Sequence, residues 1–192
     1  AEVINLAFSG RTEYKDNESA EFTVQISDNY TFADKYVLIN GKRYEIDENG
    51  KVNAKKLEIG DYKAVLYLVS KYNETINSEI PFRIVDTTPP NATIRLENTD
   101  IKVGDTVTAI IDAYDNTGIK EITATVDENE CTVLGNNTIV IENIGTGKHI
   151  IKVTVKDYEG NGCISSYEFI VSDEIGSDFF VENELSTSSS RG

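Results

Sequence analysis

The apolar residues of this chain come in short runs of strand length, and turn-forming residues separate each run from the next. Runs rich in Val, Ile, Tyr and Phe that are bounded by Gly, Asn, Asp or Pro predict β-strands. No long segment shows the 3.6-residue periodicity of an amphipathic helix. The sequence therefore predicts an all-β fold, and the first half of the chain supplies strands at residues 2–8, 21–26, 36–40, 43–46, 62–69 and 79–85.

Two Asn-Gly pairs give the strongest hairpin signals in the chain, Asn40-Gly41 and Asn49-Gly50. A type I′ turn requires a positive φ at both of its central residues, and Asn followed by Gly meets that requirement best. We therefore expect a tight hairpin at each pair. The stretch 48–58 contains Asn, Gly and Val, which argue against a helix there.

The first series of strands stops at Pro89-Pro90. Two consecutive prolines cannot donate to a sheet ladder, and they stiffen the chain toward polyproline geometry. Each half of the chain has roughly the ~100 residues of one sandwich domain. The sequence predicts two tandem immunoglobulin-like β-sandwiches of the seven-strand class, residues 1–86 and 87–172, before an acidic, Ser-rich tail at 173–192. The strands expected in the second half are 92–96, 106–113, 119–126, 131–134, 138–142, 149–156 and 164–171.

One motif occurs in both halves. Leu57-Glu-Ile-Gly60-Asp-Tyr62 precedes an apolar strand in the first half, and Ile144-Gly-Thr-Gly147-Lys-His149 precedes one in the second. The spacing resembles a tyrosine corner, in which a ring near the start of a strand hydrogen-bonds to backbone a few residues upstream. We expect Tyr62 and His149 to occupy equivalent positions in two sandwich repeats.

The charge of the chain excludes some partners. The formal net charge is −15 and the isoelectric point is near 4.4, so the chain repels phosphate backbones and nucleic acid is not an expected partner. No apolar run approaches the ~18 residues of a membrane span, so no direct membrane insertion is expected in this segment.

Several features point to an exported protein. The sequence has no Met, even at position 1, which predicts a chain processed after a removed signal or cut from a longer gene. Cys131 and Cys163 could close a loop of about 30 residues, worth roughly 3 kcal/mol, or could remain two separate thiols. Five N-x-[ST] sequons predict possible glycosylation and an extracellular, cell-surface location: Asn17, Asn29, Asn73, Asn91 and Asn136.

Two passages resemble the Ig-like repeats of bacterial and archaeal adhesin-like cell-surface proteins. Asp86-Thr-Thr-Pro-Pro-Asn-Ala-Thr-Ile94 is similar to the start of such a repeat; Asp115-Asn-Thr-Gly-Ile119 and Val155-Lys-Asp-Tyr-Glu-Gly-Asn161 are similar to its interior loop and its last turn. The resemblance implies a spacer, adhesion or surface-lattice role and names no ligand. The chain departs from many such repeats in having two cysteines and no Trp.

No catalytic constellation is evident. His149 is the single His of the chain, and its corner position predicts a structural hydrogen bond. Gly145-Thr-Gly-Lys148 lacks both the earlier Gly and the following Ser or Thr of a phosphate loop. We therefore expect a protein that is not an enzyme.

Calcium is the one cofactor that the sequence suggests, because hard cations bind clustered loop oxygens. If the loops after the second and sixth strands of the second sandwich share one pole, some of its acidic side chains meet there. The alternative is a set of ordinary solvated carboxylates. The candidate ligands are Asp86, Asp112, Asp115, Asp157 and Glu159.

Three functions remain open from the sequence. The first is an adhesin or stalk segment whose partners are other surface proteins or glycans. The second is a subunit that assembles with copies of itself into a surface layer or filament, with Phe179, Phe180 and Val181 of the tail docking on a sheet edge. The third is an accessory module of a secreted hydrolase.

Overall fold

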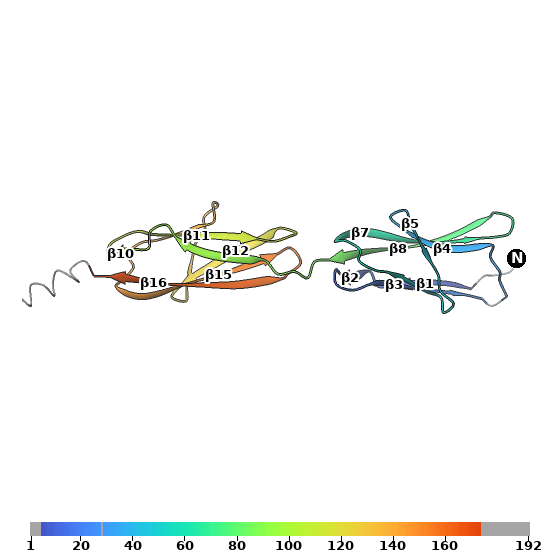
Figure 1. Ribbon diagram of the computed structural model, residues 1–192, viewed down its shortest axis with the longest axis horizontal. Helices are drawn as coiled ribbons and strands as arrows, with labels where there is room; N and C mark the ends of the chain where they lie inside the picture. Colours follow the sequence, from blue (N-terminus) through green and yellow to red (C-terminus); the bar gives the residue numbers. More distant parts are fainter. Residues whose placement is uncertain (1–4, 28, 174–192) are drawn as a thin grey trace, which may run out of the picture. The chain divides into compact units, whose positions relative to one another are not determined.

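The structure, a computed structural model, describes residues 5–27 and 29–173, and it divides into two compact units, Ala1–Thr87 and Thr88–Gly192. Every regular element among the described residues is a strand (Figure 1). Within residues 5–27 and 29–173, each unit holds one three-stranded and one five-stranded sheet. The fold class predicted from the sequence, two immunoglobulin-like β-sandwiches, is confirmed.

The described residues of the first unit form eight strands. Its three-stranded sheet has the order β1-β3-β6, and its five-stranded sheet has the order β2-β8-β7-β4-β5. The strands are β1 (Leu6–Gly10), β2 (Glu13–Lys15), β3 (Ala20–Ile26), β4 (Asp34–Ile39), β5 (Lys42–Glu45), β6 (Lys51–Ala54), β7 (Gly60–Val69) and β8 (Thr75–Val85).

The second unit repeats this arrangement strand for strand. Its three-stranded sheet has the order β14-β11-β9, and its five-stranded sheet has the order β10-β16-β15-β12-β13. The strands are β9 (Asn91–Leu96), β10 (Ile101–Lys102), β11 (Val107–Tyr114), β12 (Ile119–Val126), β13 (Asn129–Cys131), β14 (Thr138–Ile141), β15 (Gly147–Asp157) and β16 (Gly162–Ser172).

The expectation of seven strands in each unit was wrong. In both units a short strand pairs parallel with the last strand, β2 with β8 and β10 with β16, and all other pairings are antiparallel. The sequence reading missed β2, β6 and β10, which have three, four and two residues. Segments this short show too few residues for a two-residue alternation to be recognised.

Alternation along the central strands builds a separate core in each unit. In β7, Ala64, Leu66 and Leu68 are each 0% exposed, and β15 buries Ile151 and Val153 in the same way. Successive side chains of a strand point to opposite faces, so these residues line the interior while their neighbours face water. Each unit therefore has its own set of buried side chains, as the two separate core clusters show.

The two Asn-Gly pairs form different turns. Asn40 and Gly41 have φ values of 47° and 78°, and they join the paired strands β4 and β5 as a type I′ hairpin requires. The expectation of a hairpin at Asn49-Gly50 was wrong, because β5 and β6 belong to different sheets. There the Asp47 carboxylate organises the turn by accepting hydrogen bonds from the backbone N–H groups of Asn49 (2.9 Å) and Lys51 (2.8 Å).

Candidate functional site

The duplicated corner is present in both units. The Tyr62 hydroxyl donates to the carbonyl oxygen of Glu58 at 2.7 Å, and His149 Nε2 donates to the carbonyl oxygen of Gly145 at 2.7 Å. Each ring thus bonds to backbone four residues upstream, as the motif spacing predicted. Burial, followed by the nearby Glu58 carboxylate, raises the pKa of Tyr62, so its hydroxyl stays protonated as a donor.

The second ring nitrogen of His149, Nδ1, also has a hydrogen-bond partner. His149 Nδ1 lies 2.5 Å from Asp127 Oδ2, and Gly145 O can only accept, so both ring nitrogens face acceptors. Burial acts to lower the pKa of His149, but the hydrogen bonds to Asp127 and Gly145 outweigh it, and the net pKa is raised. The charged ring can donate to both acceptors, which accounts for the raised pKa.

Two of the predicted calcium ligands come together at one end of the second unit. Asp115 follows β11 in the loop that leads to β12, and Asp157 ends β15 before the tight turn into β16. A carboxylate oxygen of Asp115 lies within 4.8 Å of one of Asp157. The two side chains are 8% and 1% exposed, so both carboxylates are withdrawn from water.

Asp157 organises the turn between β15 and β16. Its Oδ1 accepts hydrogen bonds from the backbone N–H groups of Glu159 and Asn161, each at 2.9 Å, and its Oδ2 accepts one from Asn161 Nδ2 at 2.7 Å. The backbone N–H of Asp157 donates to the carbonyl oxygen of Asn161 at 2.9 Å, which closes the turn. The position of this carboxylate is therefore fixed by three hydrogen bonds within one short loop.

Asp115 is bonded through one oxygen alone. Its Oδ2 accepts hydrogen bonds from the backbone N–H and from the hydroxyl of Thr117, both at 2.9 Å. Its Oδ1 is buried and has no hydrogen-bond partner among the residues that the structure describes. A buried carboxylate oxygen without a partner carries the full cost of its lost hydration.

Asp112 and Glu159 do not belong to this acidic cluster. Asp112 is exposed on β11 and forms an ion pair with Arg95, with 3.1 Å between Oδ2 and Nε. Glu159 is partly buried in the turn after β15. Asp86 follows β8 in the first unit and is 2% exposed.

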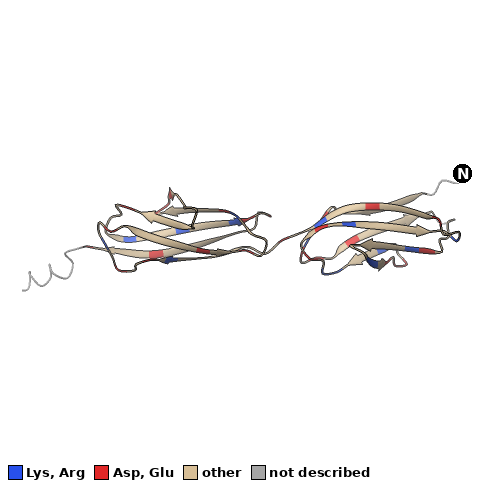
Figure 2. Cartoon of the chain, turned by 90° about the horizontal axis from the view of Figure 1, so that it is seen from above, with Lys and Arg blue, Asp and Glu red and all other residues tan. Residues whose placement is uncertain are grey.

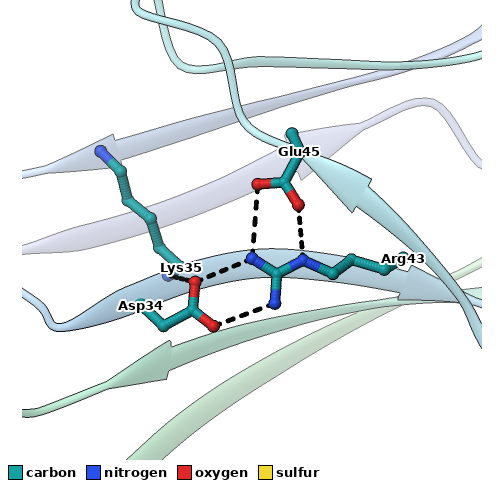
Figure 3. Close-up of polar contacts among 4 residues, drawn as sticks. All are labelled: Asp34, Lys35, Arg43 and Glu45. Atoms are coloured by element: carbon teal, nitrogen blue, oxygen red, sulfur yellow. Dashed lines mark hydrogen bonds and ion pairs between the residues drawn. The ribbon is translucent and has the colours of Figure 1, made fainter.

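In the first unit, two neighbouring carboxylates are neutralised by an arginine of the same hairpin. On the β4–β5 hairpin, Arg43 makes two hydrogen bonds to Asp34, at 2.8 and 2.9 Å, and two to Glu45 (Figure 3). The hydrogen bonds from Arg43 hold the pKa of Asp34 below its usual range. Among residues 5–27 and 29–173, no Lys or Arg forms an ion pair with Asp115 or Asp157.

The disulfide expected between Cys131 and Cys163 is not formed, and both are free thiols. Cys131 ends β13 and Cys163 lies in β16, and β12 and β15 separate these strands in the sheet. Three strand spacings amount to about 14 Å, whereas a disulfide needs Cα atoms within about 7 Å. Sequence reasoning could not see this, because the separation depends on strand order.

The sequence also predicted glycosylation sites and an assembly segment in the tail. All five sequon asparagines are exposed: Asn17, Asn29, Asn73, Asn91 and Asn136. Their glycosylation stays a prediction. The tail residues Phe179, Phe180 and Val181 lie outside the described residues. Acidic and basic residues both occur on strands of the two units (Figure 2).

The structure also contains a pocket that sequence reasoning missed. It lies in the first unit between the segment before β4 and the turn that joins β7 to β8, and its volume is about 460 Å³. Tyr30 and Phe32 are stacked with their ring centroids 6.2 Å apart, and Tyr72 is 75% exposed. Lys71, with its ammonium 5.2 Å from the Tyr72 ring centroid, and Glu74 add charged groups to the lining. The sequence feature that could have indicated this pocket is the aromatic residue Tyr72 within a turn.

No protein-family model and no curated protein matches the chain. Solved structures similar to it include the amphioxus IgVJ-C2 molecule, at 15% identity and a TM-score of 0.53, over 82% of this chain and 99% of that one. A PcdhgB3 EC1-4 structure matches at 13% identity and a TM-score of 0.50, over 88% of this chain and 50% of that one. Fibronectin(III)-like modules of Clostridium thermocellum CbhA match at 12% identity and a TM-score of 0.40, over 89% and 95%.

At these identities the similarity shows the fold alone, and the fold is immunoglobulin-like. The described residues contain no helix of the length and apolar character needed to cross a membrane. Function has to be argued from the residues of this chain, because sandwiches of this class carry many unrelated functions.

Proposed function

We propose that the chain is a non-catalytic module of an extracellular surface protein, acting as a stalk or spacer segment and as an adhesin. The observation that carries the proposal is the repetition of one complete sandwich frame in two units, each with its own buried core. A chain of self-contained units joined through a short prolyl segment suits a role that extends a protein from a surface. The sequon asparagines are exposed, as glycosylation of an exported protein would require. The net charge of −15 favours solubility.

The hydrogen bonds made by the single His support the non-catalytic part of the proposal. Both nitrogens of His149 are engaged by Asp127 and Gly145, so the residue serves the corner of the second unit. The aromatic pocket that includes Tyr30, Phe32 and Tyr72 is the candidate contact surface for the adhesin part. Such rings offer apolar area, and the adjacent Lys71 and Glu74 offer polar groups that could orient a glycan.

A glycan-binding experiment tests the adhesin part. The chain is applied to a panel of host and cell-wall glycans beside Tyr72→Ala, with Tyr114→Ala as the matched control because Tyr114 is an equally exposed ring (69%) in the other unit. The proposal predicts binding that Tyr72→Ala weakens at least tenfold and Tyr114→Ala leaves unchanged. Uniform failure to bind would overturn the adhesin part. Turnover of ester, glycoside or peptide substrates by the purified chain would overturn the non-catalytic part.

A further inference from the structure

Asp115 and Asp157 form a site that the structural role proposed above does not use. Both carboxylates are more than nine-tenths buried, and an oxygen of one lies within 4.8 Å of an oxygen of the other. Two like charges at this separation and out of water repel each other strongly. Unlike Asp34 and Glu45, which share Arg43, they have no ion pair to a Lys or Arg of the described residues.

One oxygen in this pair points to a missing ligand. The four hydrogen bonds from Thr117 and the β15–β16 turn account for Asp115 Oδ2 and for Asp157 Oδ1, while Asp115 Oδ1 is buried without any partner among the described residues. Buried polar oxygens in folded proteins are satisfied by a hydrogen bond, a water or an ion. A cation between the two carboxylates would complete the coordination of this oxygen and cancel the repulsion.

The first unit supplies an internal comparison. Ser70 occupies the position of Asp157, because Gly60 and Gly147 pair with equivalent residues of the last strands and the register continues from there. Ser70 Oγ accepts hydrogen bonds from the backbone N–H groups of Tyr72 (3.2 Å) and Glu74 (3.1 Å), as Asp157 Oδ1 does from the corresponding residues. The turn therefore forms with a neutral side chain, and the negative charge at Asp157 is not required to build it.

We propose that the second unit binds one calcium ion between the carboxylates of Asp115 and Asp157, which ties the β11–β12 loop to the β15–β16 turn. Carboxylate oxygens are hard ligands, which favour calcium or magnesium over softer metals. Calcium accepts six to eight oxygen ligands in a flexible geometry, whereas magnesium demands a near-ideal octahedron and loses its water reluctantly, so carboxylates already held in place by two loops favour calcium. An affinity in the range of extracellular calcium modules, about 10⁻⁴–10⁻³ M, is expected for so few charged ligands.

The test uses the whole chain, freed of metal with a chelator and titrated with calcium chloride from 10 µM to 10 mM. Binding is measured by calorimetry, and the midpoint of thermal unfolding is followed in parallel because a ligand that binds the folded state alone raises it. The variants are Asp115→Asn and Asp157→Ser, the second chosen because Ser70 supports the same turn. Asp112→Asn is the matched control, since Asp112 is an exposed aspartate of the same unit that is paired with Arg95.

Calcium should bind the unaltered chain and raise its unfolding midpoint, and magnesium should do so at least tenfold more weakly. Asp115→Asn and Asp157→Ser should each weaken calcium binding at least tenfold, while Asp112→Asn keeps it within twofold. Without calcium, Asp115→Asn should be at least as thermostable as the unaltered chain, because the substitution removes a repelling charge. No calcium-dependent heat or midpoint shift up to 10 mM, equal response to magnesium, or equal loss in Asp112→Asn would each overturn the proposal.

Discussion

Tyr62 and His149 occupy the same position in the two units. Tyr62 pairs across the sheet with Phe82 and His149 with Phe169. The Tyr62 ring stacks on Phe82 with centroids 5.3 Å apart, and the His149 ring lies tilted against Phe169 with centroids 5.5 Å apart. Each also donates a hydrogen bond to the carbonyl four residues upstream. One structural role is thus filled by a phenol in one unit and by an imidazole in the other, and the two differ in their response to pH.

The Tyr62→Phe substitution should destabilise the first unit by about 1 kcal/mol, the typical net value of one hydrogen bond. The ring and its stacking on Phe82 are kept, so the loss reports the bond to the Glu58 carbonyl. Chemical denaturation of the variant and of the unaltered chain measures the difference. Equal free energies of unfolding would show that the hydroxyl contributes nothing at this corner.

The stability of the second unit should fall as the pH rises through the pKa of His149. That pKa is raised above the unfolded value of about 6.5 in the folded chain, so the contribution of the charged ring is complete below that value. It is lost as the pH rises through the folded pKa. The single His gives one imidazole signal in a magnetic resonance titration, which should show a midpoint above 6.5. His149→Phe should remove this step in stability, and a step that persists would assign it to another group.

Asp127, the partner of His149, determines how this interaction responds to low pH. The hydrogen bonds from His149 and from the Ile150 backbone N–H hold the pKa of Asp127 below its usual range. Its contribution to stability is therefore present above the unfolded carboxyl pKa and is lost as the pH falls through the lower folded value. Asp127→Asn should lower the midpoint of the His149 titration, and an unchanged midpoint would contradict the assigned ion pair.

The core of the first unit should be sensitive to loss of Phe22. This ring is 1% exposed and lies 5.1 Å from the ring of Phe82, measured between centroids. Phe22→Ala should cost about 3–5 kcal/mol, as for other buried aromatic truncations. Ile164→Ala, at a residue that is 67% exposed, is the control and should stay within about 0.5 kcal/mol. Similar losses in the two variants would contradict the assigned core.

The frame of the molecule was predictable from the sequence because it depends on local patterns. The corner motifs of Tyr62 and His149 were recognisable, since each consists of a Gly, an aromatic ring and an apolar strand at fixed spacing. The strands β2 and β10 were missed because two or three residues carry no periodicity. The fate of Cys131 and Cys163 was misjudged because it depends on the order of strands within a sheet.

The acidic site was predictable in part. Loop position suggested that Asp115 and Asp157 could meet, and the structure brings them together. The same reasoning included Asp112, but its exposed place on β11 lets it form an ion pair with Arg95 of the adjacent strand β9. Sequence could not show that Asp115 Oδ1 is buried without a partner, since burial and hydrogen bonding are products of the three-dimensional packing.

The central claim is that the chain consists of two autonomous sandwiches in tandem, and stretching a single molecule between inert handles tests it most directly. Two unfolding steps are predicted, and each should release the length of one unit of about 80 residues, which is roughly 250–300 Å of extended chain. Phe22→Ala should lower the force of one step and leave the other unchanged. A single step that releases the whole chain would contradict the account, because it would mean one shared cooperative core.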